Sequence, residues 1–168
     1  MRMEKVDIAE CSFIYDVSQE ANYTECYQSK VNNGKITLES CLLSLLYKPQ
    51  WVTILYKLRN VLVKPFGLKA TTELNATSNV QKGDKFVFFN VLERNEREIL
   101  LFANDKHLEA WFSIQYDVNQ DCSVVTFATV FKYHNLMGRI YFIIIKPFHY
   151  LIIRDLLSRT CNLNKKRI

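Results

Sequence analysis

Three histidines are the side chains in this sequence best suited to move protons or to bind metals: His107, His134 and His149. His107 lies between Asp105 and Glu109, a pattern that permits an acid–base cluster beside a turn. A mononuclear zinc site needs three or four ligands in tetrahedral reach, and no two histidines lie four residues apart on one helix. The sequence contains no GxSxG, HExxH or phosphate-binding loop motif. We expect no metal and no cofactor, and His107 and His149 are the candidate catalytic residues of an alternative, enzymatic function.

The segment that must position two of these histidines is long and apolar. It runs from His134 to Arg159, and apolar side chains nearly encircle a helix of roughly 35–40 Å. Such a helix has to be covered on most sides, so we expect it to be buried in the protein. Pro147 removes a backbone donor within it and predicts a kink. A bent helix over a curved sheet leaves space for a cavity, with four polar residues at its mouth: His134, Arg139, Tyr141 and His149.

Two shorter helices are expected before the main run of strands. Thr37 can cap a helix that ends near Tyr47, because the apolar residues after Thr37 recur at intervals of three and four. Pro49 suits the first turn of a second helix, which ends at Pro65. Few residues join the two helices, so we expect them to be neighbours in space.

Four segments separated by short polar turns predict an antiparallel meander. They are residues 86–93, 98–103, 107–118 and 123–133. A first strand is expected at residues 9–17, whereas residues 18–36 fit no element clearly. Alternate residues from Leu108 onward are apolar, which predicts one sheet face toward the long helix and the other toward water. By the same parity, His107 points away from the core. Strands beside segregated helices indicate the α+β class.

The composition is that of a globular protein, with 49% hydrophobic and 23% charged residues among 168. This length fits a single domain spanning residues 1–168. The net charge is +5, but no dense basic run alternates with aromatics, so nucleic acid is not expected as a partner. Five cysteines without a CxxC pair indicate reduced thiols in a cytoplasmic protein. The longest apolar run is interrupted and too short for a membrane span. The oligomeric state stays open.

Three segments carry a resemblance to a known family. They are PQWVTILYKLRNVLVKPFGLK (Pro49–Lys69), ANDKHLEAWFS (Ala103–Ser113) and VFKYHNLMGRIYFIIIKPFHYLIIRDLL (Val130–Leu157). The sequence resembles the family DUF2867, to which no activity is assigned. This resemblance implies the helix-grip fold of START-like and Bet v 1-like proteins, an antiparallel sheet wrapped around a long, kinked C-terminal helix, here with two short helices after the first strand. Some relatives carry a Rossmann-type domain in front, but this chain has no GxGxxG motif and implies no nicotinamide site.

We hypothesise a binding domain for a small apolar or amphipathic molecule, held between the long helix and the sheet. The side chains expected to line the cavity are Phe88, Phe112, Phe127, Tyr141, Ile144 and Phe148, with His134, Arg139 and His149 as polar contacts. One alternative is a cyclase- or hydrolase-like enzyme that uses His107 or His149. Another is an interaction module whose core is filled.

Overall fold

The computed structural model describes residues 3–32, 37–46, 50–51, 53–54, 79–87, 89–118 and 122–163. Trp51 and Ile54 are helical, as expected for the second short helix. The remainder of that expected helix lies outside the described residues, and so does Phe88.

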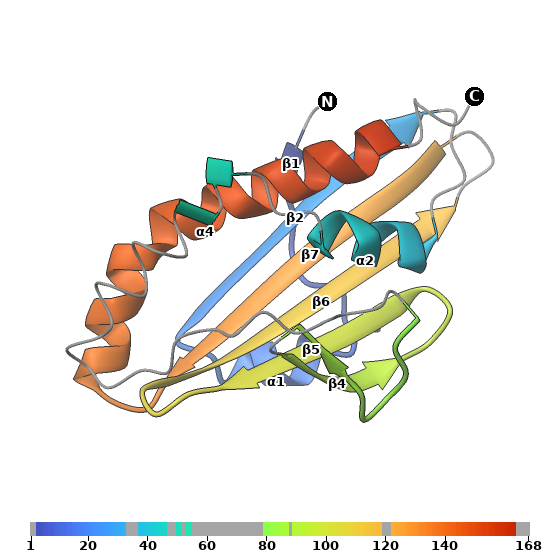
Figure 1. The fold of residues 1–168 in the computed structure, drawn as a ribbon. Coiled ribbons are helices and arrows are strands. Elements are labelled where there is room, and N and C mark those ends of the chain that lie inside the picture. Colours follow the sequence, from blue (N-terminus) through green and yellow to red (C-terminus); the bar gives the residue numbers. More distant parts are fainter. Residues whose placement is uncertain are drawn as a thin grey trace.

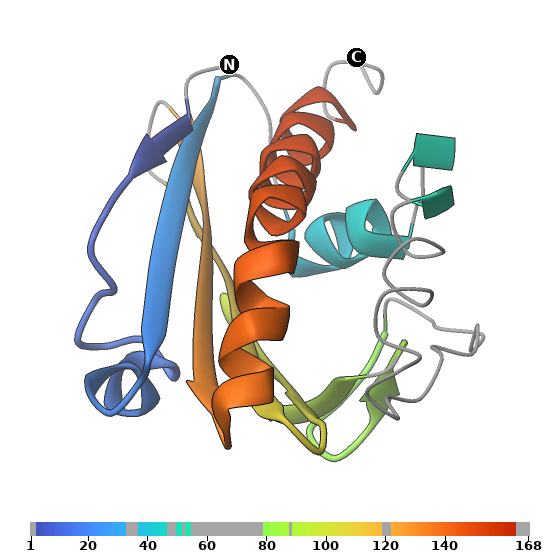
Figure 2. The same cartoon turned by 90° about the vertical axis from the view of Figure 1, so that its left-hand side faces the viewer.

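The described strands form one seven-stranded antiparallel sheet in the order β1-β2-β7-β6-β5-β4-β3. Their bounds are β1 Met3–Lys5, β2 Tyr23–Asn32, β3 Lys85–Phe86, β4 Phe89–Arg94, β5 Glu98–Asn104, β6 Leu108–Val118 and β7 Cys122–Tyr133. The expected strands at residues 98–103, 107–118 and 123–133 are confirmed as β5, β6 and β7. The expected single strand at residues 86–93 is wrong, because Phe86 belongs to β3, which pairs antiparallel with β4. The sheet curls around the helices on its inner face (Figure 2), and a register shift between Val91 and Glu93 in β4 interrupts the pairing there.

The expected first strand at residues 9–17 is wrong. These residues form turns and the beginning of helix α1, Tyr15–Gln19. The long N-terminal strand is instead β2, from the stretch that fitted no element, and it pairs with β7 along its whole length. Its inward residues include Glu25 and Ser29, so the apolar alternation that marks a strand is missing from the sequence.

Helix α4, Leu136–Leu163, and helix α2, Leu38–Leu46, cover the inner face of the sheet. The core between these layers includes Phe127, Ile114 and Leu101 from the strands and Ile153 and Leu157 from α4. This arrangement is α+β and consistent with a helix-grip fold. The predicted inward face of β6 is confirmed, because Phe112 and Ile114 pack in this core whereas Trp111 packs on the opposite face.

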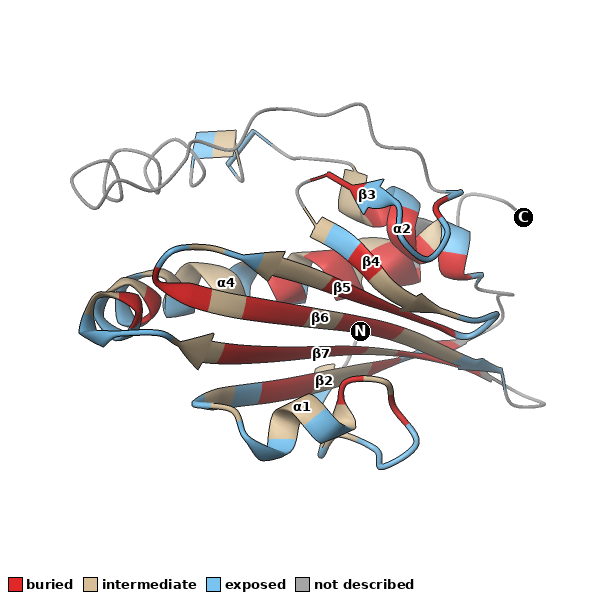
Figure 3. Ribbon diagram, turned by 90° about the horizontal axis from the view of Figure 1, so that it is seen from below, coloured by how far each residue is buried: buried red, intermediate tan, exposed pale blue. Residues whose placement is uncertain are grey.

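The outer face of the sheet is covered over part of its area, contrary to the expectation that it faces water. The N-terminal segment crosses it and buries Ile14 against Trp111 and Val130. There the buried carboxylate of Glu98 accepts hydrogen bonds from the hydroxyls of Ser12 at 2.7 Å and Ser113 at 2.6 Å. The middle of the central strands is therefore buried from both sides (Figure 3).

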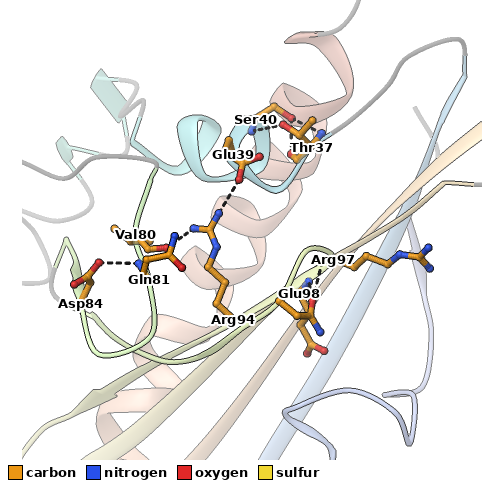
Figure 4. Close-up of polar contacts among 10 residues, drawn as sticks. Thr37, Glu39, Ser40, Val80, Gln81, Asp84, Arg94, Arg97 and Glu98 are labelled. Carbon is orange, nitrogen blue, oxygen red and sulfur yellow. Dashed lines mark hydrogen bonds and ion pairs between the residues drawn. The ribbon is translucent and has the colours of Figure 1, made fainter.

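The cap of α2 forms as expected and fixes where that helix begins. The Thr37 hydroxyl accepts a hydrogen bond from the Ser40 backbone N–H at 3.3 Å. Arg94, at the end of β4, donates to the Glu39 carboxylate at 2.7 Å and to the Val80 carbonyl (Figure 4). These contacts hold the start of α2 over the edge of the sheet.

Helix α4 is bent along its length (Figure 1), and Pro147 lies inside it. By length and composition, residues Leu136–Cys161 qualify as a candidate membrane span, and 22% of the most apolar window is buried inside the protein. The expectation that this helix is covered on most sides is therefore wrong. Its outward side chains, such as Ile143 at 62% exposure, face solvent.

Candidate functional site

A buried carboxylate and an imidazole meet between α4 and the inner face of the sheet. Nε2 of His149 lies 2.8 Å from Oε1 of Glu25, and their side chains are 11% and 4% exposed. The other carboxylate oxygen of Glu25 accepts a hydrogen bond from the Tyr23 hydroxyl at 2.9 Å. Among the described residues, neither Oε1 nor Nε2 has a hydrogen-bond partner, so the two atoms are within ion-pair distance but do not form a well-aligned hydrogen bond. We call Glu25, His149 and Tyr23 the polar cluster.

Two periodicities bring the polar cluster together. On β2, alternation places Tyr23, Glu25 and Tyr27 on the inner face, with Glu25 opposite Thr129 of β7. On α4, His149 follows Phe142 by seven residues and precedes Ile153 by four, so it shares their buried side. The sheet and the helix thus aim an acid and a base at each other across the core.

Aromatic rings surround the polar cluster. The rings of Phe112 and Phe131 pack edge-on against His149, with centroids at 5.3 Å and 5.4 Å. Phe142 packs on Tyr23 at 4.7 Å. Such neighbours exclude water and strengthen the electrostatic interaction between the carboxylate and the imidazole.

The pKa values of the cluster follow from this environment. Burial would raise the pKa of Glu25, but the contacts with His149, Tyr23 and Tyr27 outweigh burial and hold that pKa below its ordinary value of 4.5. Burial and the hydrogen bond to Glu25 raise the pKa of Tyr23 far above its ordinary value. Burial and the Glu25 charge also raise the pKa of Tyr27. At neutral pH the cluster therefore holds an ionised glutamate and a protonated phenol.

The other two histidines lie at the opposite end of the bent helix, where they join α4 to the β5–β6 turn. Nδ1 of His107 lies 3.2 Å from Oδ1 of Asn135, which also caps α4 by accepting from the Gly138 N–H at 3.1 Å. The His134 backbone N–H donates to the His107 carbonyl at 2.9 Å. A Cβ at Gly138 would overlap that same carbonyl. His107, Asn135 and Gly138 therefore attach the start of α4 to the β5–β6 turn, and they do not converge with His149. We call these three residues the docking motif.

The remaining expected site residues separate into three groups. Phe112 and Phe127 lie in the core beneath α4, and Tyr141, at the helix start, packs against a separate cluster that includes Phe131 and Phe142. Phe148 is half-buried. Ile144 and Arg139 are exposed on α4, away from the polar cluster.

An open depression of about 810 Å³ lies beside the C-terminal half of α4. It is lined by Met3, Trp51, Tyr150, Leu151, Arg154, Asp155 and Ser158. Tyr150 also packs edge-on against Tyr27 at 5.8 Å, and Tyr27 faces Glu25. One pair of rings therefore separates the depression from the polar cluster.

The sequence reading named His149 but missed Glu25 and Tyr23. Both lie in residues 18–36, where no strand was recognised. The weak signal in the sequence was the recurrence of Tyr23 and Tyr27 at even spacing, which Glu25 interrupts, because this inward face carries a polar group.

Thiols and metal ligands add nothing to the polar cluster. Cys26, Cys41 and Cys161 are buried and form no disulfide, and burial raises the pKa of Cys26 and of Cys41 to about 12, which makes both poor nucleophiles. Within the described ranges, no three metal-ligating side chains gather.

Comparison with known proteins supports a family but no activity. A conserved protein from Geobacillus kaustophilus is similar in structure, at 12% identity and a TM-score of 0.44, over 86% of this chain and 96% of that one. No curated protein matches the sequence. The model of the family "Protein of unknown function (DUF2867)" matches residues 17–156, which include the polar cluster, the docking motif and most of α4. The chain therefore belongs to the DUF2867 family.

Proposed function

We propose that this domain binds a small, neutral amphipathic molecule, whose polar group reaches Glu25 and His149 and whose apolar part lies between α4 and the sheet. The observation that carries the proposal is the buried Glu25–His149 contact inside an aromatic wall. A buried carboxylate–imidazole pair is a costly way to join a helix to a sheet, because hydrophobic residues of similar volume would often be as stable. The presence of such a pair in the core supports a recognition role.

The charge balance of the polar cluster sets the ligand class. The carboxylate and the imidazole compensate each other when both are ionised, so a charged head group would add an unpaired buried charge. A hydroxyl can donate to Oε1 of Glu25, and either a hydroxyl or a carbonyl can accept from Nε2 of His149. A neutral hydroxyl or carbonyl compound is therefore the preferred ligand.

The apolar surroundings supply the rest of the recognition. Phe112, Phe131 and Phe142 give apolar walls next to the polar atoms, which is the usual composition of a small-molecule site. The open depression, lined by Tyr150 and Leu151, offers an entry route on the solvent side.

Native mass spectrometry of protein purified from its own host tests this proposal. We expect a retained small molecule on the wild type and at least tenfold less of it on Glu25→Gln. Glu98→Gln is the matched control, since Glu98 is an equally buried glutamate on the opposite face of the sheet. Equal retention by the two variants, or no retained mass on folded wild type, would contradict the proposal.

An acid–base enzyme is the second candidate, favoured by the carboxylate that contacts the His149 imidazole at 2.8 Å. If His149 acts on the bound molecule, His149→Gln should retain a compound that differs in mass from the one on the wild type. The same compound on both proteins would rule out this second function and leave simple binding.

A further inference from the structure

The outer side of α4 carries a continuous apolar stripe. Six large side chains form it, with exposures between 39% and 68%: Leu136, Ile140, Ile143, Ile144, Tyr150 and Leu151. Their spacing of three, four and seven residues keeps them on one side of the helix over about 22 Å. We call these six residues the α4 stripe.

Cationic side chains border the α4 stripe. Arg139 and Lys146 are seven residues apart and follow the same edge, and Arg154 is exposed at its C-terminal end. The ammonium of Lys146 also lies 4.5 Å from the ring centre of Tyr23, which holds it at that edge. Asp155 is the acidic residue in the sequence of α4, and Arg159 engages its carboxylate at 2.8 Å. The stripe is thus an apolar surface with a positive margin.

Aromatic side chains complete the pattern. Trp51 and Tyr150 both line the open depression, next to Leu151 and Arg154. Tryptophan and tyrosine prefer the boundary between lipid chains and water, where one end of the ring system is apolar and the other is wet. Helices that lie in the plane of a membrane surface combine an exposed apolar side with cationic residues and aromatic residues.

We propose that the α4 stripe docks reversibly on an anionic lipid surface. The apolar residues enter the boundary between head groups and acyl chains, and Arg139, Lys146 and Arg154 contact the lipid phosphates. The chain's net charge of +5 favours the same surface. A symmetric contact with a second copy would instead bring two positive margins together. This docking does not depend on the ligand proposed for the polar cluster.

Vesicle flotation of the full chain tests this docking. We expect the wild type to float with vesicles of equal parts phosphatidylglycerol and phosphatidylcholine, to remain below with pure phosphatidylcholine, and to detach as NaCl rises. Ile143→Asp, at the centre of the stripe, should lower the bound fraction at least tenfold. Val118→Asp is the matched control, an equally exposed aliphatic residue at the end of β6, and should float like the wild type.

Sedimentation velocity of the same samples distinguishes lipid docking from self-association through the α4 stripe. We expect the wild type and Ile143→Asp to sediment identically without lipid. A dimer that Ile143→Asp dissociates would overturn the proposal in favour of self-association. Failure of the folded wild type to float with anionic vesicles, or equal flotation with both vesicle types, would also overturn it.

Discussion

Glu25 is the residue whose charge state has the clearest consequence. Three groups face its carboxylate, namely His149 from α4 and Tyr23 and Tyr27 from its own strand. The sequence singles out His149 as one of three histidines, but nothing local predicts its partner, since the two residues are far apart in the chain. Pairing across a sheet and a helix is a property of the fold, and sequence reading fails when one of the two elements goes unrecognised.

The lowered pKa of Glu25 predicts how stability depends on pH. A carboxylate with a lower pKa in the folded state stabilises fully above its unfolded pKa, near 4.5, and this stabilisation is lost as the pH falls through the folded pKa. The difference in unfolding free energy between wild type and Glu25→Gln should therefore shrink below about pH 4.5. Urea denaturation at pH 7, 5, 4 and 3 measures it. A difference that stays constant or grows toward pH 3 would contradict the assignment.

At the scale of elements, the docking of α4 depends on contacts at its first turn. Asn135, Gly138 and His107 fit together there through a cap and a close backbone approach. The sequence predicted the approximate length of this helix and its bend, because apolar periodicity and the effect of a proline on a helix are local. It did not predict which side stays exposed, since that depends on which elements pack against the helix.

Gly138→Ala should destabilise the protein by about 1–3 kcal/mol, because the new methyl group overlaps the His107 carbonyl. Alanine normally favours a helix over glycine by about 1 kcal/mol, so the expected sign is opposite to the intrinsic preference. Chemical denaturation measures the change. Leu136→Ala, two residues earlier and exposed, should stay within about 0.5 kcal/mol of wild type. A stabilised Gly138→Ala would show that the close approach does not exist.

The start of α2 offers a smaller test at the same scale. Thr37→Ala removes the hydroxyl that accepts from the Ser40 N–H and should cost about 1 kcal/mol of unfolding free energy. Thr37→Ser keeps that oxygen and serves as the matched control. Equal loss in both variants would mean that the methyl group, not the cap, stabilises this end.

At the scale of the whole molecule, the two faces of the sheet have different roles. The outer face buries Glu98 with three hydrogen-bond donors from Ser12, Phe13 and Ser113, which makes a satisfied structural group. The inner face buries Glu25 against one imidazole and one phenol, inside aromatic walls. The α+β class, most of the meander and the long C-terminal helix were predictable from the sequence. The location of the polar cluster was not, because it arises where β2 and α4 meet.

The most direct test of ligand binding uses the three histidines as internal reporters. Side-chain ¹⁵N NMR of the labelled protein during titration with 1-octanol, a neutral amphipathic probe, should show saturable shifts at His149 and none at His107 or His134. At neutral pH, octanoate should bind His149 at least tenfold more weakly, because its charge has no partner there. An unchanged His149 signal, or equal changes at all three histidines, would contradict a site at Glu25 and His149.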